Sequence, residues 1–190
     1  MCPTINLFPG SSVVTQEAVS HQVMDFARRT LVVFDSRVPD LTTLLNALVK
    51  NTTSYILTPE EYPLLTITYL LSKTRTRRLA LVAPGAPGLI HLGAECLDRA
   101  RVKARAGLLQ EWGVEEIDLY SCRVGQDGRF IEELAQQTGA RVAAATGLVG
   151  SAAQGGSWKL ANQSSSAVFD LKRLQAYKSV LSGEELSKAS

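Results

Sequence analysis

Short apolar runs, separated by more polar periodic segments, recur along the chain between residues 31 and 144. Residues 31–34 and 79–82 are uninterrupted apolar runs, which are typical of strands covered on both faces of a parallel sheet. Similar short runs predict three further strands at residues 55–57, 117–120 and 142–144. Because these strands alternate with helical periodicity, the pattern predicts an α/β fold with a mainly parallel sheet and helices on both faces.

Capping residues and apolar spacing predict the connecting helices. Asp40, just after a proline, opens one helix, and Thr58 is expected to cap a second that ends near Ser72. Gly139 is expected to end another helix, because glycine readily adopts the left-handed conformation at a helix C-terminus. The predicted helices cover about 40–48, 58–72, 97–112, 129–137 and 171–181.

Three shorter extended segments complete the expected structure. Residues 89–93 suggest a hairpin strand, and residues 158–160 and 167–169 are expected to form a small antiparallel pair. The loop Gly85-Ala86-Pro87-Gly88 superficially resembles a phosphate-binding loop. It lacks the Lys-Ser/Thr pair of such loops and precedes a strand, so it gives only weak support for a phosphate site.

The pattern divides the chain into three parts. Residues 1–27 lack clear periodicity and are interpreted as an extended arm, with a short helical stretch near 16–26. Residues 28–181 form one α/β domain, a size that supports a full core, and residues 182–190 form a polar tail. Since terminal segments fray unless they are held, an ordered arm would indicate docking on a partner, through residues 1–25.

Composition and charge argue against a nucleic-acid-binding, membrane-spanning or secreted protein. The chain is 45% hydrophobic and 20% charged, as expected for a globular protein, and its net charge of +2 gives no reason to expect nucleic acid. The longest apolar stretch, residues 62–71, is about half of the roughly 20 residues that span a bilayer. Neither a membrane span nor a secretory signal is therefore predicted.

The three cysteines, Cys2, Cys96 and Cys122, are odd in number and widely spaced. They predict neither a disulfide framework nor a metal site, and no cofactor is expected. Reduced thiols in a cytoplasmic compartment are the ordinary interpretation.

A basic segment offers one candidate interaction surface. Residues 73–105 contain eight of the chain's 20 basic residues: Lys73, Arg75, Arg77, Arg78, Arg99, Arg101, Lys103 and Arg105. This segment could bind an acidic protein surface. However, positions 99 and 103 fall on a different helix face from 101 and 105, which favours an ordinary solvated helix and turn.

Cys122 is the first candidate functional residue. It follows the predicted strand 117–120, and an α/β sheet presents functional side chains at the carboxyl ends of its strands. A cysteine nucleophile normally needs a histidine that accepts its proton and later protonates the leaving group. The two histidines are His21, in the arm and expected on the surface, and His91, expected to face solvent on the hairpin.

Two aspartates near the predicted strands, Asp35 and Asp118, are candidates for a carboxylate pair. Asp35 ends the first strand, where a cap or turn role is the simpler interpretation. Asp118 lies inside the strand that leads to the candidate cysteine, and the sequence gives no account of it.

Four ordered motifs resemble one known family. They occupy residues 33–40, 85–93, 119–144 and 155–160. Together they resemble a bacterial domain-of-unknown-function family, often found near the N-terminus of very large surface proteins and related to the caspase and gingipain-like cysteine peptidases. The resemblance covers about residues 30–170 and implies a caspase-like three-layer sandwich.

The resemblance also implies where catalytic residues would lie. In that family the third strand ends in Ser-His-Gly, whose histidine is the general base, and the fourth strand ends in the nucleophilic cysteine. Here the cysteine is retained as Cys122, but Pro84 stands at the histidine position. A proline can neither accept nor donate a side-chain proton, and acid–base help is typically worth about 10²–10⁴ in rate.

These observations predict a non-catalytic domain that binds other proteins as a subunit or adaptor of a larger assembly. The family occurs in cyanobacteria among other bacteria, so a photosynthetic supercomplex is one compatible host, although no residue selects it. One alternative is a cysteine peptidase that uses Cys122 with a relocated base, His91, or one supplied by a partner. Another is a small-ligand site in the vacated pocket at the strand ends.

Overall fold

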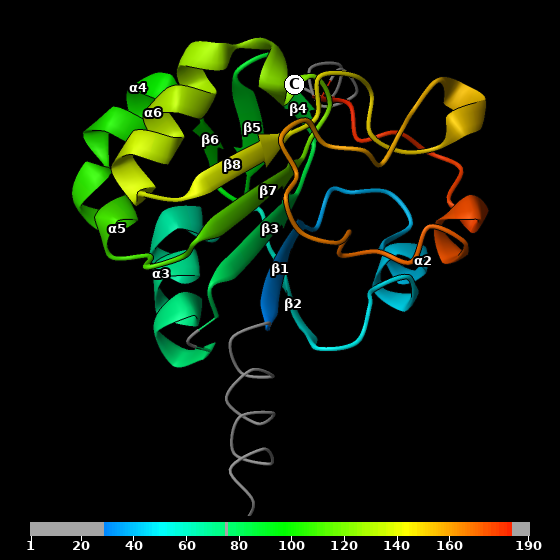
Figure 1. Ribbon diagram of the computed structural model, residues 1–190, viewed down its shortest axis with the longest axis horizontal. Coiled ribbons are helices and arrows are strands. Elements are labelled where there is room, and N and C mark those ends of the chain that lie inside the picture. Colours follow the sequence, from blue (N-terminus) through cyan, green and yellow to red (C-terminus); the bar gives the residue numbers. More distant parts are fainter. Residues whose placement is uncertain (1–28, 75, 184–190) are drawn as a thin grey trace, which may run out of the picture.

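The computed structural model describes residues 29–74 and 76–183 (Figure 1). The predicted arm, residues 1–27, lies outside the described residues, as do His21 and the tail beyond residue 183. Within the described ranges, no helix combines the length and apolar character needed to cross a membrane.

Five strands form one wholly parallel sheet. They are β1 (Thr30–Asp35), β2 (Thr52–Leu57), β3 (Arg78–Val82), β7 (Glu116–Tyr120) and β8 (Arg141–Ala144), in the order β2-β1-β3-β7-β8. All five predicted strands are present, and the predicted three-layer α/β architecture is confirmed.

The two faces of the sheet are covered very differently (Figure 1). One face packs against α3 (Pro63–Thr74), α4 (Arg99–Ala104), α5 (Ala106–Gln110) and α6 (Gly128–Thr138). The other face is covered by the short helix α2 (Leu41–Asn46) and by the irregular chain of residues 147–183. Alternate strand residues feed the two cores: Leu31 and Val33 belong to the first, Val32 and Phe34 to the second.

Aromatic side chains hold the irregular layer on the sheet. The ring of Phe169 lies 5.3 Å from that of Tyr120 and 5.2 Å from that of Trp158, and Trp158 lies 5.5 Å from Tyr177. These tilted and edge-on contacts bury apolar area without regular secondary structure.

Two predictions for the irregular layer are wrong. Residues 158–160 and 167–169 do not pair with each other: Ala161 bridges to Ala144 of β8, and Phe169 bridges to Leu48 after α2. The predicted helix at 171–181 is also wrong, because only the 3₁₀ turn η3 (Arg173–Ala176) forms. Packing of the aromatic cluster overrides the local helical pattern and draws the following chain out across the sheet.

On the other face of the sheet, the observed helix boundaries differ from the predicted ones at residues 58–63 and 105. Thr58 does not cap a helix, because the Glu61 carboxylate accepts hydrogen bonds from the Thr58 N–H (2.7 Å) and the Tyr55 hydroxyl (2.6 Å), forming a turn. The helix starts instead at Pro63, a position that proline favours. The predicted helix 97–112 is divided into α4 and α5 at Arg105, whereas Gly139 ends α6 as predicted, with φ 70°.

A small antiparallel sheet stands at the carboxyl ends of the core strands. It consists of β4 (Gly85–Ala86), β5 (Leu89–Leu92) and β6 (Glu95–Leu97), so the predicted hairpin is confirmed and gains a third strand. Its turn contains Gly93 at φ 50°, where a Cβ would lie 2.4 Å from the Glu61 carbonyl oxygen. This glycine therefore allows the hairpin to rest directly on the turn before α3.

Candidate functional site

The ends of β3 and β7 lie side by side, which places Pro84 and Cys122 on neighbouring strand ends. The Ala83 N–H donates to the Tyr120 carbonyl at 3.2 Å and continues the ladder beyond both strands. A Cβ on Gly85 would lie 2.7 Å from the Ser121 Cβ, so the two chain segments after these strands are in direct contact. This junction is filled with protein atoms.

The thiol of Cys122 is buried, with only 1% of the residue exposed. Its Sγ accepts a hydrogen bond from the Val149 N–H at 3.2 Å and lies 3.8 Å from the Val149 carbonyl oxygen. The residue belongs to the core of the irregular layer, beside Tyr177 and Leu181. A substrate carbonyl cannot reach this sulfur unless the surrounding chain moves.

Residues 179–183, which we call the C-terminal strap, close this end of the sheet. The Ser151 N–H donates to the Ser179 carbonyl at 2.8 Å, and the Leu181 N–H donates to the Val149 carbonyl at 2.8 Å. On the other side, the Gly85 N–H donates to the Leu181 carbonyl at 3.3 Å. The strap thus joins the end of β3 to the same backbone that holds the Cys122 sulfur.

Gly150 permits this close packing. Its φ of 135° is accessible to glycine, and a Cβ there would lie 2.3 Å from the Ser179 carbonyl oxygen and 2.7 Å from the Val180 Cα. Because both contacts are with backbone, no side-chain rotation could relieve them.

Two buried hydroxyls lie at this junction. Within the described residues, Ser121 Oγ and the Tyr177 hydroxyl are buried and make no hydrogen bond with protein. Burial raises the pKa of Tyr177 above its usual value, and the charge of Asp40 adds to the shift. The phenol is therefore neutral at physiological pH and does not act as a base.

The structure brings His91 to Cys96, the cysteine that the sequence did not single out. The two residues face each other on β5 and β6, and the imidazole Nδ1 lies 3.3 Å from the Cys96 Sγ. His91 is partly buried rather than free in solvent, and burial and the nearby Arg37 charge lower its pKa. The pairing follows from the hairpin register, with two residues between Leu92 and Glu95, which sequence spacing alone could have indicated.

Asp35 has the turn role expected for it. Its carboxylate is fully buried and accepts from Arg37 Nε and Nη2, both at 2.7 Å, and from the Arg37 N–H at 2.9 Å. It also accepts from the Gly93 N–H at 2.7 Å. The carboxylate therefore fastens the hairpin tip to the end of β1.

Asp118 belongs to a separate charge cluster and does not pair with Asp35. It is buried within β7 and accepts from Arg78 Nε at 3.0 Å. Arg78 also contacts Glu116, which accepts from Arg141, Ser164 and Ser165. Burial raises the pKa of Asp118, although Arg78 partly opposes the shift. The cluster ties residues 163–165 to β7, which accounts for this aspartate structurally.

Most of the basic segment is already paired with carboxylates. Seven of its eight basic residues lie in the described part of the chain, and five of these form ion pairs: Arg77 with Glu115, Arg78 with Asp118, Arg99 and Lys103 with Glu133, and Arg101 with Glu95. These contacts agree with a solvated helix and turn better than with an open cationic face.

The glycine loop 85–88 is likewise engaged within the chain. The Gly85 N–H is bound by the C-terminal strap, and the Gly88 N–H donates to the Val124 carbonyl at 3.2 Å. A phosphate group would need such amides free.

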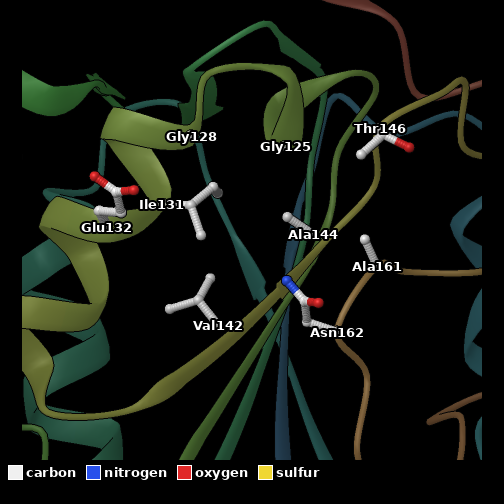
Figure 2. A pocket seen from close by; sticks show the side chains of 9 residues that line it. All are labelled: Gly125, Gly128, Ile131, Glu132, Val142, Ala144, Thr146, Ala161 and Asn162. Atoms are coloured by element: carbon white, nitrogen blue, oxygen red, sulfur yellow. The ribbon is translucent and has the colours of Figure 1, made fainter.

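Neither Cys122 nor Pro84 lines the two larger open cavities of the described residues. Figure 2 shows one of about 230 Å³ beside the edge strand β8, with Ile131, Val142 and Ala144 on its walls and Glu132 at its rim. A second, of about 380 Å³, lies in the irregular layer and is lined in part by Trp158, Leu171 and Tyr177. The strap fills the strand ends where a vacated pocket was expected. No cluster of three potential metal ligands occurs among the described residues.

Comparison with known proteins gives one match. The profile of a family described as "Domain of unknown function (DUF4347)" matches residues 31–181, most of the chain. No curated protein and no solved structure matches. The matched range begins in β1 and ends within the C-terminal strap, so it includes both the sheet and its closure.

Proposed function

Because the chain belongs to the DUF4347 family, whose description names no activity, we propose that it is a non-catalytic, caspase-like domain that binds other proteins as a subunit or adaptor of a larger assembly. The observation that carries the proposal is the burial of the Cys122 sulfur, held by the Val149 N–H below the C-terminal strap. The parallel sheet, with Pro84 and Cys122 on adjacent strand ends, supports kinship with cysteine peptidases.

The chemistry of the junction argues against peptide hydrolysis. A cysteine peptidase needs a base that takes the thiol proton and then protonates the leaving amine. Pro84 can do neither, and the imidazole of His91 is engaged with Cys96. The buried pair of hydroxyls, Ser121 and Tyr177, supplies no base, since burial keeps the phenol protonated.

Protein binding would use surfaces outside this junction. The arm, residues 1–25, is our candidate docking element, and the parts of the basic segment that remain exposed are a secondary one. The proposed compartment is cytoplasmic, and a photosynthetic supercomplex is one compatible host.

Thiol labelling tests whether the nucleophile is active. In a Cys2→Ser/Cys96→Ser variant, iodoacetamide should label Cys122 only as fast as the protein opens, with full labelling in denaturant. A native thiol that is labelled rapidly, with an apparent pKa well below 7, would contradict the proposal and restore the peptidase with a relocated or partner-supplied base.

Deletion of residues 1–25 tests the docking element. We expect the truncated chain to lose co-purification with the partner while its core still unfolds in one cooperative thermal transition, measured by circular dichroism. Retention of the partner by the truncated chain would show that the arm is not the docking element.

A further inference from the structure

Cys96 and His91 form a thiol–imidazole pair on the outer side of the hairpin. Their side chains lie opposite each other in the β5–β6 ladder, with Nδ1 3.3 Å from Sγ, and Cys96 is exposed to solvent. The neighbouring Ile90, Leu92 and Leu97 point into the core and fix the hairpin below the pair. The pair is therefore held by a packed element and is open to reagents.

A fixed positive charge stands beside this pair. Arg37 interacts electrostatically with both Cys96 and His91. Its guanidinium is held in place by the buried Asp35 carboxylate and by the Gly93 carbonyl at 3.1 Å. The thiol–imidazole pair therefore lies near a guanidinium whose position is fixed by the end of β1 and by the hairpin.

The imidazole of His91 is neutral, and its Nδ1 faces the thiol of Cys96. Burial and the Arg37 charge lower the pKa of His91, so the ring is neutral at pH 7. In the tautomer that carries its proton on Nε2, the free Nδ1 faces the Cys96 sulfur. A neutral base within hydrogen-bond distance of a thiol is the arrangement that activates cysteine nucleophiles.

We propose that Cys96 is a site of reversible S-thiolation, at which the thiol exchanges with a small disulfide. His91 Nδ1 takes the proton of Cys96, and the thiolate attacks one sulfur of the disulfide. A new S–S bond forms at Cys96, the reagent's S–S bond breaks, and the departing thiolate takes the proton from His91. The products are one protein mixed disulfide and one small thiol, and no other oxidant is needed.

Within the described residues, no second thiol can resolve the adduct. Cys122 is buried under the C-terminal strap and is not joined to Cys96. An added thiol reagent reverses the modification at Cys96. The inference does not depend on the proposed protein-binding function.

The test uses a Cys2→Ser/Cys122→Ser variant, in which Cys96 is the remaining cysteine. With 5,5′-dithiobis(2-nitrobenzoate) at pH 7, we expect the native thiol to react about tenfold faster than the same thiol in denaturant. The additional substitution His91→Gln should remove this advantage, since general-base help is typically worth at least this much. Oxidised glutathione should add one glutathionyl group by mass spectrometry, and dithiothreitol should remove it.

One control makes the result decisive. The His91→Gln variant must show the thermal transition of its parent, so that a change in rate reports on the imidazole. If Cys96 reacts no faster in the native state than in denaturant, or if His91→Gln leaves the rate unchanged, the inference is overturned. Either outcome is independent of Cys122, whose labelling tests the proposed function separately.

Discussion

Two buried aspartates, Asp35 and Asp118, occupy similar positions on core strands but have different structural roles. Asp35 fastens the hairpin, whereas Asp118 joins Arg78 across neighbouring strands. The sequence indicated the first role because Asp35 precedes a turn. The second depends on strand order, since Arg78 and Asp118 are 40 residues apart and approach each other only when β3 pairs with β7.

Removal of Arg78 should leave the Asp118 carboxylate buried without its cation. We expect Arg78→Met to lower the free energy of unfolding by about 3 kcal/mol at pH 7, measured by urea denaturation. The folded-state pKa of Asp118 is raised, so its contribution to stability is present at low pH and is lost as pH rises through that pKa. The loss caused by Arg78→Met should therefore be smaller at pH 4 than at pH 7.

Arg77→Met is the matched control. Arg77 forms an exposed ion pair with Glu115, so its loss should cost no more than about 1 kcal/mol. Equal destabilisation by Arg78→Met at the two pH values would show that Asp118 is not the group left unpaired.

At the level of single residues, only part of the candidate site could be predicted from the sequence. The sequence placed Pro84 and Cys122 after the third and fourth predicted strands, and the structure adds that these strands, β3 and β7, are neighbours in the sheet. The pairing of His91 with Cys96 depends on hairpin register, which one residue of slip would abolish. The burial of Cys122 depends on Val149 and Leu181, which are remote in sequence and carry no motif.

At the scale of elements, the C-terminal strap is the segment that distinguishes this junction from an open active site. It adds short bridges to Gly85 on one side and to Gly150 on the other. Its backbone hydrogen bonds are few, and segments held by few such bonds open locally at low cost.

Gly150→Ala should loosen the strap. The new Cβ would collide with the Ser179 carbonyl, and φ 135° is strained for alanine, so we expect a local cost of about 2 kcal/mol. Since about 1.4 kcal/mol corresponds to tenfold, iodoacetamide labelling of Cys122 should accelerate at least about tenfold.

Gly147→Ala is the control for this substitution. A Cβ at Gly147 meets nothing within 4 Å, so labelling of Cys122 should stay at the parental rate. Unchanged labelling in Gly150→Ala would show that the strap does not limit access to the sulfur.

The elements also differ in how far sequence predicted them. The five core strands were recognisable because runs such as residues 31–34 must be apolar on both faces of a covered parallel sheet. The layer of residues 147–183 could not be recognised from the sequence, because the aromatic residues that pack it are irregularly spaced along the chain. Trp158, Phe169 and Tyr177 meet only in three dimensions, and no local periodicity encodes their contacts.

At the scale of the whole molecule, the described domain begins and finishes at opposite ends of its parallel strands (Figure 1). Thr30 starts β1 at the amino-terminal end of the strands. The C-terminal strap lies beside β4, at their carboxyl-terminal end. The proposed docking arm therefore joins the domain at the end remote from Cys122 and Cys96.

This arrangement has a mechanical consequence. Tension applied between the two ends of the described domain would act along the strand direction and would shear β1 against both its neighbours, so that many ladder bonds would resist together. The strap would instead peel away, because its few bonds to Gly85, Val149 and Ser151 would be pulled apart one after another. Under force the domain would thus release its carboxyl-terminal closure first and expose the Cys122 sulfur while the sheet remained intact.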